Sequence, residues 1–283
     1  MDAVFDEAAR VVREATALVI TAGAGMGVDS GLPDFRGAEG FWKAYPAYGH
    51  LGLRFEELAN PTWFRRDPAL AWGFYGHRRN LYRATVPHAG FAVLRRWTER
   101  MRDGSFVFTS NVDAQFQRAG FDEARVVECH GTIVHDQCTD DCGAGIFAAD
   151  ERRIDVDAET FRAREPWPRC RRCHALARPN VLMFGDGGWE PDRTDAQEER
   201  LGRWMDALRR NADARVVVVE CGAGTAIPTV RMFGEQLVQA VGARLIRVNV
   251  REPDAPAGQI EIPLGARAAL EAIDRRLSLS AVD

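Results

Sequence analysis

Short apolar runs alternate with amphipathic stretches along most of the chain. The runs typical of buried strands cover residues 17–21, 105–109, 126–127, 181–184, 215–220 and 244–250. Apolar residues recur at helical spacing over residues 3–16, 88–102, 196–210, 231–240 and 263–277. Short, almost wholly apolar runs indicate parallel strands that are buried on both faces. The alternation therefore predicts an α/β fold with a Rossmann-like doubly wound parallel sheet.

Two stretches depart from this alternation. Residues 38–87 carry many aromatic side chains at helical spacing with prolines at the breaks, which predicts an inserted helical module whose rings mostly form its own core. Residues 132–180 are rich in loops and hold four of the six cysteines, which predicts a second, zinc-binding module. We therefore expect the sheet domain to combine residues 1–37, 88–131 and 181–283.

Composition narrows the classes of protein that fit. The chain has 283 residues, of which 46% are hydrophobic and 28% charged, as in ordinary globular proteins. No apolar run approaches 18 residues and the acidic N-terminus does not resemble a signal peptide, so we expect a cytoplasmic protein without a membrane partner. The net charge of −4 argues against nucleic-acid binding. Nothing in the sequence requires a partner subunit.

A glycine-dense turn follows the first predicted strand. Gly23, Gly25 and Gly27 lack a Cβ, so the backbone there can turn tightly and present N–H groups to a diphosphate. The same pattern also fits a purely structural turn, because glycine turns after strands are common. The continuation Pro33-Asp34-Phe35-Arg36 joins a rigid bend, a carboxylate, an aromatic ring and a guanidinium, which favours a ligand site.

Polar side chains also end the next two predicted strands. Asn111 and Asp113 offer a donor and an acceptor together, which suits a carboxamide such as nicotinamide, although an Asx turn before a helix is the alternative. His130 lies beside Gly131 after residues 126–127. An imidazole there can accept a proton near neutral pH, and a surface or capping histidine is the alternative.

The cysteines fall into two close pairs, Cys138-x3-Cys142 and Cys170-x2-Cys173. Two such pairs can place four thiolates tetrahedrally around Zn²⁺, and four protein ligands leave no open position for catalysis. The spacing therefore predicts a structural zinc site. Disulfides or buried free thiols are the alternative, which the absence of an export signal makes less favourable.

Two further patterns suggest ligand contacts. A second glycine turn, Gly222-Ala223-Gly224-Thr225, follows the predicted strand 215–220 and suits a ribose or a phosphate. Tyr75 and Arg78 are three residues apart on a predicted helix and so share a face, where a phenol and a guanidinium could bind a carboxylate. A solvated helix face with Tyr75 packed beneath it is the alternative.

These motifs together resemble the sirtuins, a family of NAD-dependent protein-lysine deacylases, over about residues 15–275. The family signature GAG-x-S-x-x-SGIPDFRG is matched at Gly23-Ala24-Gly25, Ser30-Gly31 and 33–37, and its TQNID element at Thr109, Asn111 and Asp113. His130-Gly131 matches the catalytic His-Gly, and residues 178–186 are similar to RPxVVxFGE. The chain departs from the family at Gly27, Ser110, Gln115-Phe116 and Asp186, where Ser, Gln, Leu-His and Glu are usual.

The resemblance implies a reaction and a set of sites. An acylated protein lysine and NAD would give free lysine, nicotinamide and O-acyl-ADP-ribose, with His130 as general base and Asn111 as the second catalytic residue. The implied NAD contacts are Gly23, Ala24, Gly25, Asp34, Phe35, Arg36, Ser110, Asn111, Asp113, Gly222, Gly224, Thr225, Asn249 and Ala266. The implied substrate contacts are Val181, Phe184 and Gly185, where the substrate backbone would add as a strand, and Tyr75 and Arg78, which match a motif of desuccinylases and demalonylases. Cys138, Cys142, Cys170 and Cys173 would hold the structural zinc.

Two alternatives from other functional classes remain. The departures at Gly27, Ser110 and Phe116 are compatible with an NAD glycohydrolase or a mono-ADP-ribosyltransferase on the same scaffold. A catalytically silent NAD-binding or zinc-bearing interaction module is the other alternative. Release of nicotinamide with and without an acyl peptide distinguishes the three.

Overall fold

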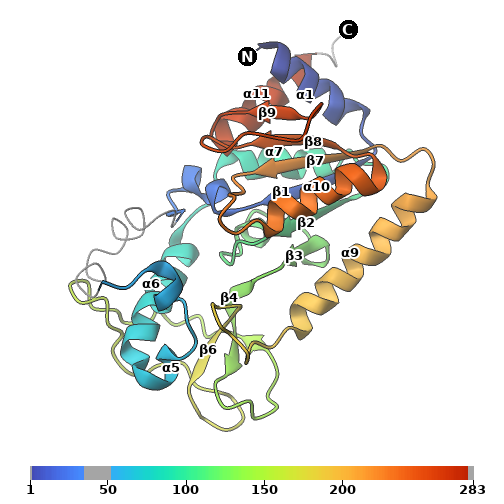
Figure 1. Ribbon diagram of the computed structural model, residues 1–283. Helices are drawn as coiled ribbons and strands as arrows, with labels where there is room; N and C mark the ends of the chain where they lie inside the picture. The colour runs from blue at the N-terminus through green and yellow to red at the C-terminus, as the bar shows by residue number, and fades with distance from the viewer. Residues whose placement is uncertain (1, 35–51, 280–283) are drawn as a thin grey trace.

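A six-stranded parallel sheet organises the protein (Figure 1). The computed structural model describes residues 2–34 and 52–279. The strands are β1 (Ala17–Ala22), β2 (Ser105–Thr109), β3 (Val126–Glu128), β7 (Val216–Cys221), β8 (Arg244–Val248) and β9 (Ile260–Ile262), in the order β3-β2-β1-β7-β8-β9. All residues of β1 and β7 are buried, as their apolar sequences predict. The strand order reverses between β1 and β7, which confirms the doubly wound architecture.

Helices cover both faces of this sheet (Figure 1). One face packs against α1 (Asp2–Glu14), α7 (Ala89–Thr98) and α11 (Ala266–Leu279), and the other against α9 (Asp192–Arg210) and α10 (Thr229–Val241). Each of these helices was expected from helical spacing, with ends that differ by a few residues. None of the helices in the described residues has both the length and the apolar character needed to cross a bilayer.

A smaller part lies beside the sheet domain (Figure 1). It contains α4 (Phe55–Leu58), α5 (Trp63–Arg66) and α6 (Pro68–Ala84), together with an antiparallel sheet of β4 (Gly131–Cys138), β5 (Phe147–Ala148) and β6 (Ala177–Val181). The rings of α6 share one core with Ile133, Ile154 and Met183. Among the described residues, the aromatic face of the helical module therefore shares its core with the module that carries the cysteines.

Three short connecting elements lie between these helices and strands in the described residues. They are η1 (Ala24–Ser30), α8 (Gln115–Arg118) and η2 (Glu123–Arg125). The first of them turns the chain immediately after β1 and so shapes the glycine-dense turn.

Two strand predictions were wrong in position. The apolar run 181–184 suggested a strand, but β6 ends at Val181, and the strand is formed by the polar sequence before it. Arg178 and Asn180 are buried there, where the Asp186 carboxylate pairs with the Arg178 guanidinium and the Gln137 side chain accepts from the Asn180 amide nitrogen. Likewise β8 ends at Val248, one residue before Asn249, and the short β9 follows it. Three residues are too few for a periodic signal, so β9 was missed.

Candidate functional site

The carboxyl ends of five parallel strands lie side by side at one edge of the sheet. Ala22 of β1 lies opposite Thr109 of β2 and Cys221 of β7, and these two lie opposite Glu128 of β3 and Val248 of β8. The residues that follow each strand end are Gly23, Ser110-Asn111, Gly222, His130 and Asn249. Parallel pairing therefore collects five separate sequence motifs at one edge of the sheet, where open α/β folds bind ligands.

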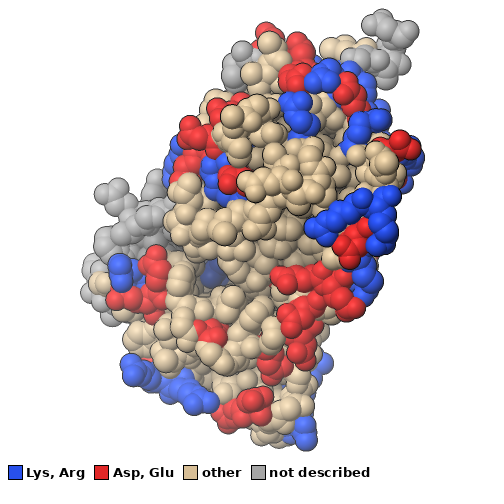
Figure 2. All heavy atoms as spheres, turned by 45° about the vertical axis from the view of Figure 1, so that its right-hand side comes forward, with Lys and Arg blue, Asp and Glu red and all other residues tan. Residues whose placement is uncertain are grey.

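A cavity of about 800 Å³ opens at this edge. Figure 2 shows a hollow in the molecular surface with basic atoms at its bottom. The predicted site residues that line the cavity are Gly23, Ala24, Asp34, Tyr75, Arg78, Ser110, Asn111, Asp113, His130, Val181, Phe184, Gly224 and Thr225. Gly25, Gly222, Gly185, Asn249 and Ala266 do not line it, and Phe35 and Arg36 lie outside the described residues.

The two glycine turns contact each other. A Cβ on Gly25 would lie 2.7 Å from the Cα of Gly222, and a Cβ on Gly222 would lie 2.3 Å from the carbonyl carbon of Gly25. The Gly25 N–H donates to the Gly222 carbonyl at 3.0 Å, and Gly222 has a φ of +63°. These two glycines are thus required for the close approach of the turns after β1 and β7, while Gly23 and Ala24 face the cavity.

Asn111 and Asp113 approach the same cavity from the turn after β2. The Asn111 side chain donates to the Gly23 carbonyl at 2.9 Å, which ties this turn to the first glycine turn. Asp113 accepts the Gln115 N–H at 2.9 Å, so the Asx turn before α8 is present, and the side chain also lines the cavity. Burial raises the pKa of Asp113 to about 6, and the charge of Glu128 acts in the same direction. The carboxyl group can therefore gain a proton in mildly acidic solution.

His130 lies between β3 and β4, with its imidazole at the cavity. Burial lowers its pKa, and a hydrogen bond with the Ser110 backbone partly opposes this shift. The ring is therefore neutral at physiological pH and able to accept a proton. The next residue must be glycine because Gly131 has a φ of +71° and a Cβ there would lie 2.1 Å from the Asn180 carbonyl oxygen.

Tyr75 and Arg78 line the cavity from α6. Arg78 is only 6% exposed and Tyr75 is 1% exposed, so this face of α6 is not a solvated helix surface. The guanidinium carbon of Arg78 lies 5.1 Å from the centre of the Phe74 ring and 5.9 Å from that of Phe55. An arginine enclosed by aromatic rings in a cavity is a strong electrostatic feature, because little water screens its charge.

The segment after β6 forms another wall. Val181, Leu182, Met183 and Phe184 line the cavity, and the Leu182 N–H donates to the His130 carbonyl at 3.0 Å. Asn60 donates from its side chain to the Phe184 carbonyl at 3.1 Å. This segment is held by a main-chain bond to His130 on one side and by bonds with Ala59 and Asn60 on the other, rather than by a regular ladder.

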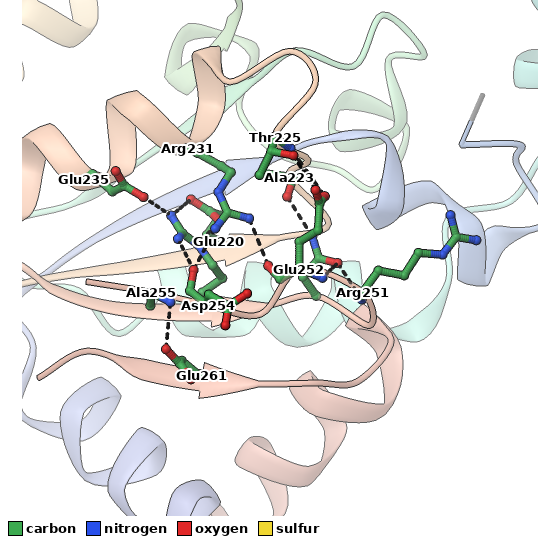
Figure 3. A network of polar contacts seen from close by, with 12 residues as sticks. Glu220, Ala223, Thr225, Arg231, Glu235, Arg251, Glu252, Asp254, Ala255 and Glu261 are labelled. Carbon is green, nitrogen blue, oxygen red and sulfur yellow. Dashed lines mark hydrogen bonds and ion pairs between the residues drawn. The ribbon is translucent and has the colours of Figure 1, made fainter. Parts of the chain in front are cut away.

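The loop after β8 closes the remaining end (Figure 3). Asn249 donates to the Ala223 carbonyl at 2.7 Å and accepts the N–H groups of Arg251 and Glu252, so its side chain joins the two loops. The Glu252 carboxylate accepts from the backbone N–H and the hydroxyl of Thr225. Arg251 and Glu252 line the cavity and were missed in the sequence, although their place just beyond a strand end was an available signal.

Two buried arginines hold this loop, and Figure 3 labels one of them, Arg231. Arg231 donates to the carbonyls of Glu252 and Asp254 at 2.9 and 2.7 Å, and Arg247 donates to the Asp254 carbonyl at 2.6 Å. Arg247 also pairs with Glu220, and both side chains are at most 1% exposed. The predicted contact Ala266 instead is the first residue of α11 and belongs to the apolar core, at 3% exposure. Its side chain packs against the sheet, so it is not part of the cavity wall.

The four paired cysteines form one cluster. Their sulfur atoms lie within 4.8 Å of one another. Cys138 and Cys173 are 3.5 Å apart at sulfur, as are Cys142 and Cys170, whereas a disulfide needs about 2.05 Å. Four thiolates at this separation fit the tetrahedral coordination of Zn²⁺, with Zn–S distances of about 2.3 Å. Asp141, which lies between Cys138 and Cys142 of the longer first pair, has a φ of +46°, in the left-handed backbone region.

Comparison with known proteins agrees with this geometry. The sequence model of the Sir2 family matches residues 23–202. The chain belongs to the Sir2 family. The "NAD-dependent protein deacylase 2" of Pyrobaculum aerophilum is 32% identical over 265 residues, with 92% of each chain covered. The "NAD-dependent protein deacylase" of Thermococcus kodakarensis is 34% identical over 243 residues, covering 86% of this chain and 83% of that one.

Two further comparisons add detail. The mitochondrial sirtuin-5 deacylase of Canis lupus familiaris is 33% identical over 192 residues, covering 62% of this chain and 58% of that protein. Among solved structures, a Sir2 homolog in complex with NAD superposes with a TM-score of 0.69 at 27% identity, covering 97% of this chain and 94% of that one. This Sir2 family protein therefore shares its whole architecture with a protein that binds NAD.

Proposed function

We propose that this Sir2 family protein removes acyl groups from protein lysines with NAD as co-substrate, using the cavity at the carboxyl ends of β1, β2, β3 and β7. The observation that carries the proposal is the single row of strand ends, which brings His130, Asn111 and the first glycine turn to one cavity. Nicotinamide and O-acyl-ADP-ribose are the expected products beside the free lysine.

The residues at the cavity fit the parts of NAD. The turn after β1 suits the diphosphate, because Gly23 and Ala24 line the cavity and their lack of bulky side chains lets the diphosphate approach the backbone closely. Asn111 and Asp113 offer a donor and an acceptor to the nicotinamide carboxamide. Thr225 and Glu252 suit the hydroxyls of a ribose, because carboxylate and hydroxyl groups accept and donate as a diol requires. Asn249 acts on this end by joining the loops that carry these two residues.

His130 is the proposed general base. A neutral imidazole at the cavity wall can accept the proton of a ribose hydroxyl while the acyl group is transferred. The enclosed position also limits the entry of water, which would otherwise hydrolyse NAD without acyl transfer. Asn111 is placed to orient the nicotinamide side of the co-substrate.

The wall of the cavity at α6 bears on which acyl group the protein removes. Tyr75 and Arg78 are buried in the cavity wall, and a guanidinium enclosed by rings favours an acyl chain that ends in a carboxylate, such as succinyl or malonyl. The substrate main chain would lie along Val181–Phe184 and pair with it as an added strand, next to the Gly185 turn.

The four-cysteine cluster lies away from this chemistry, in the antiparallel sheet, and we propose that it holds a structural zinc ion there. The corresponding division is residues 1–37, 88–131 and 181–283 for NAD, with 38–87 and 132–180 as the added modules. Cysteines used for metal rather than for disulfides fit a reducing compartment, which favours the cytoplasm.

The test uses His130→Ala with His77→Ala as a matched control, because the His77 ring packs on Phe161 rather than lining the cavity. With saturating NAD and an acetyl or succinyl peptide, mass spectrometry should detect O-acyl-ADP-ribose from the parent protein and the control. His130→Ala should bind NAD and form no product. Full activity in His130→Ala would refute the assignment of the base, and nicotinamide release that does not depend on acyl peptide would favour the NAD glycohydrolase.

A further inference from the structure

Tyr82 lines the cavity, although no sequence motif predicted it as a site residue. It lies on α6 one helical turn beyond Arg78, is 5% exposed, and lines the same cavity as His130. A tyrosine at this depth needs a partner for its hydroxyl group. The partner is Arg78, whose Nε–H donates to the Tyr82 hydroxyl oxygen at 3.0 Å.

The bond fixes the orientation of the Arg78 guanidinium. This group is planar, so the bond at its Nε–H fixes the plane in which its other N–H groups point, and with it the direction from which a carboxylate is recognised. The rings of Tyr75 and Tyr82 lie 5.6 and 5.4 Å from the guanidinium carbon and restrict its movement further. A guanidinium that is already oriented loses little freedom when a carboxylate arrives, which strengthens binding.

Tyr82 is itself held in place by the short helix α8. The Gln115 side chain donates to the Tyr82 carbonyl at 3.4 Å and to the Thr85 carbonyl at 3.5 Å, so α8 supports the end of α6. Gln115 is one of the positions at which this chain departs from the sirtuin pattern. Gln115 therefore supports the part of α6 that carries Tyr82, next to the proposed acyl pocket.

We propose that Tyr82 is a positioning residue that gives the enzyme its preference for acyl chains ending in a carboxylate, by orienting the Arg78 guanidinium. The inference rests on the proposed deacylase function and deepens it. Tyr82 acts through Arg78 and does not take part in the chemistry at His130. Acyl chains without a carboxylate gain nothing from the oriented guanidinium, so only one substrate class depends on the Tyr82 hydroxyl.

The experiment compares Tyr82→Phe, which removes only the hydroxyl, with the parent protein on two peptides that differ only in an acetyl or a succinyl group. A hydrogen bond to a charged group is worth about 1.5–3 kcal/mol, so the KM for the succinyl peptide should rise about 10-fold or more. We expect kcat for that peptide to stay within about 2-fold, because the bond acts on binding. Both constants for the acetyl peptide should change much less than the KM for the succinyl peptide.

A second variant makes the result specific. In an Arg78→Met background, Tyr82→Phe should cause no further loss with the succinyl peptide, since the hydroxyl acts only through the guanidinium. Equal losses on both peptides, or an unchanged KM for the succinyl peptide, would overturn the role of Tyr82. Acetyl turnover without succinyl turnover in the parent would also overturn it while the deacylase function stands. Turnover of neither peptide would refute the proposed function itself.

Discussion

The pair Arg178–Asp186 carries the clearest stability prediction. Two N–H groups of Arg178 donate to the two Asp186 oxygens at 2.7 and 2.8 Å, and the side chains are 5% and 0% exposed. The same oxygens accept the N–H groups of Met183 and Gly188 at 3.3 and 3.2 Å. One carboxylate therefore satisfies four donors and closes the turn next to the substrate wall.

Asp186→Asn keeps the shape and removes the charge. Its amide nitrogen would face an N–H of Arg178 and a backbone N–H, so two donors would lose their acceptor and the guanidinium would stay buried without its counterion. Removing one partner of a buried pair costs about 3–5 kcal/mol. We expect a loss of that size in the free energy of unfolding, measured by urea denaturation of the zinc-loaded protein.

The surface pair Arg209–Asp206 supplies a matched control. Arg209 Nη1 and Asp206 Oδ1 are 2.8 Å apart, but the two side chains are 51% and 58% exposed. Asp206→Asn should therefore lower the free energy of unfolding by less than about 1 kcal/mol. In a double-mutant cycle, Asp186→Asn should cost less in an Arg178→Met background than in the parent. The KM for the peptide should also rise in Asp186→Asn, because the turn lies beside Phe184. A loss below about 1 kcal/mol for Asp186→Asn would show that the carboxylate does not support the turn.

Three further predictions concern other parts of the protein. Gly222→Ala should abolish NAD binding in titration calorimetry, because the added Cβ would lie 2.3 Å from the Gly25 carbonyl carbon. The control Gly242→Ala should bind NAD normally, since Gly242 has a similar φ of +64° but no atom lies within 4 Å of its added Cβ. Burial lowers the pKa of His88, whose Nδ1 accepts the Gly90 N–H. The neutral ring should therefore contribute fully to stability above about pH 6.5, and this contribution should decline as the pH falls toward the lowered pKa. In thermal melts over that pH range, the melting temperature of His88→Asn should fall less than that of the parent protein. Metal removal by a chelator should lower the melting temperature and release one zinc per chain, and Cys170→Ser should retain less zinc by elemental analysis.

The pattern of apolar and polar residues determined the sheet and most of its helices. A two-faced strand such as β7 must be apolar along its whole length, and an amphipathic helix must repeat its apolar residues with helical spacing, so both leave a local record in the sequence. The cysteine pairs and the motifs after β1, β2 and β3 could be assigned for the same reason, because each is a compact group of residues with its own chemistry.

Only the tertiary structure decided how these groups act together. The polar strand β6 can be buried partly because Gln137 reaches the Asn180 side chain from β4, 43 residues earlier in the chain, and no local pattern contains that information. Gly25 and Gly222 are nearly 200 residues apart and meet only because β1 and β7 pair. Burial of Arg78 and its bond with Tyr82 likewise depend on what packs around α6. The sequence thus determined the elements and their chemistry, whereas side-chain environment and loop contacts arise from long-range packing, which is a property of the whole fold.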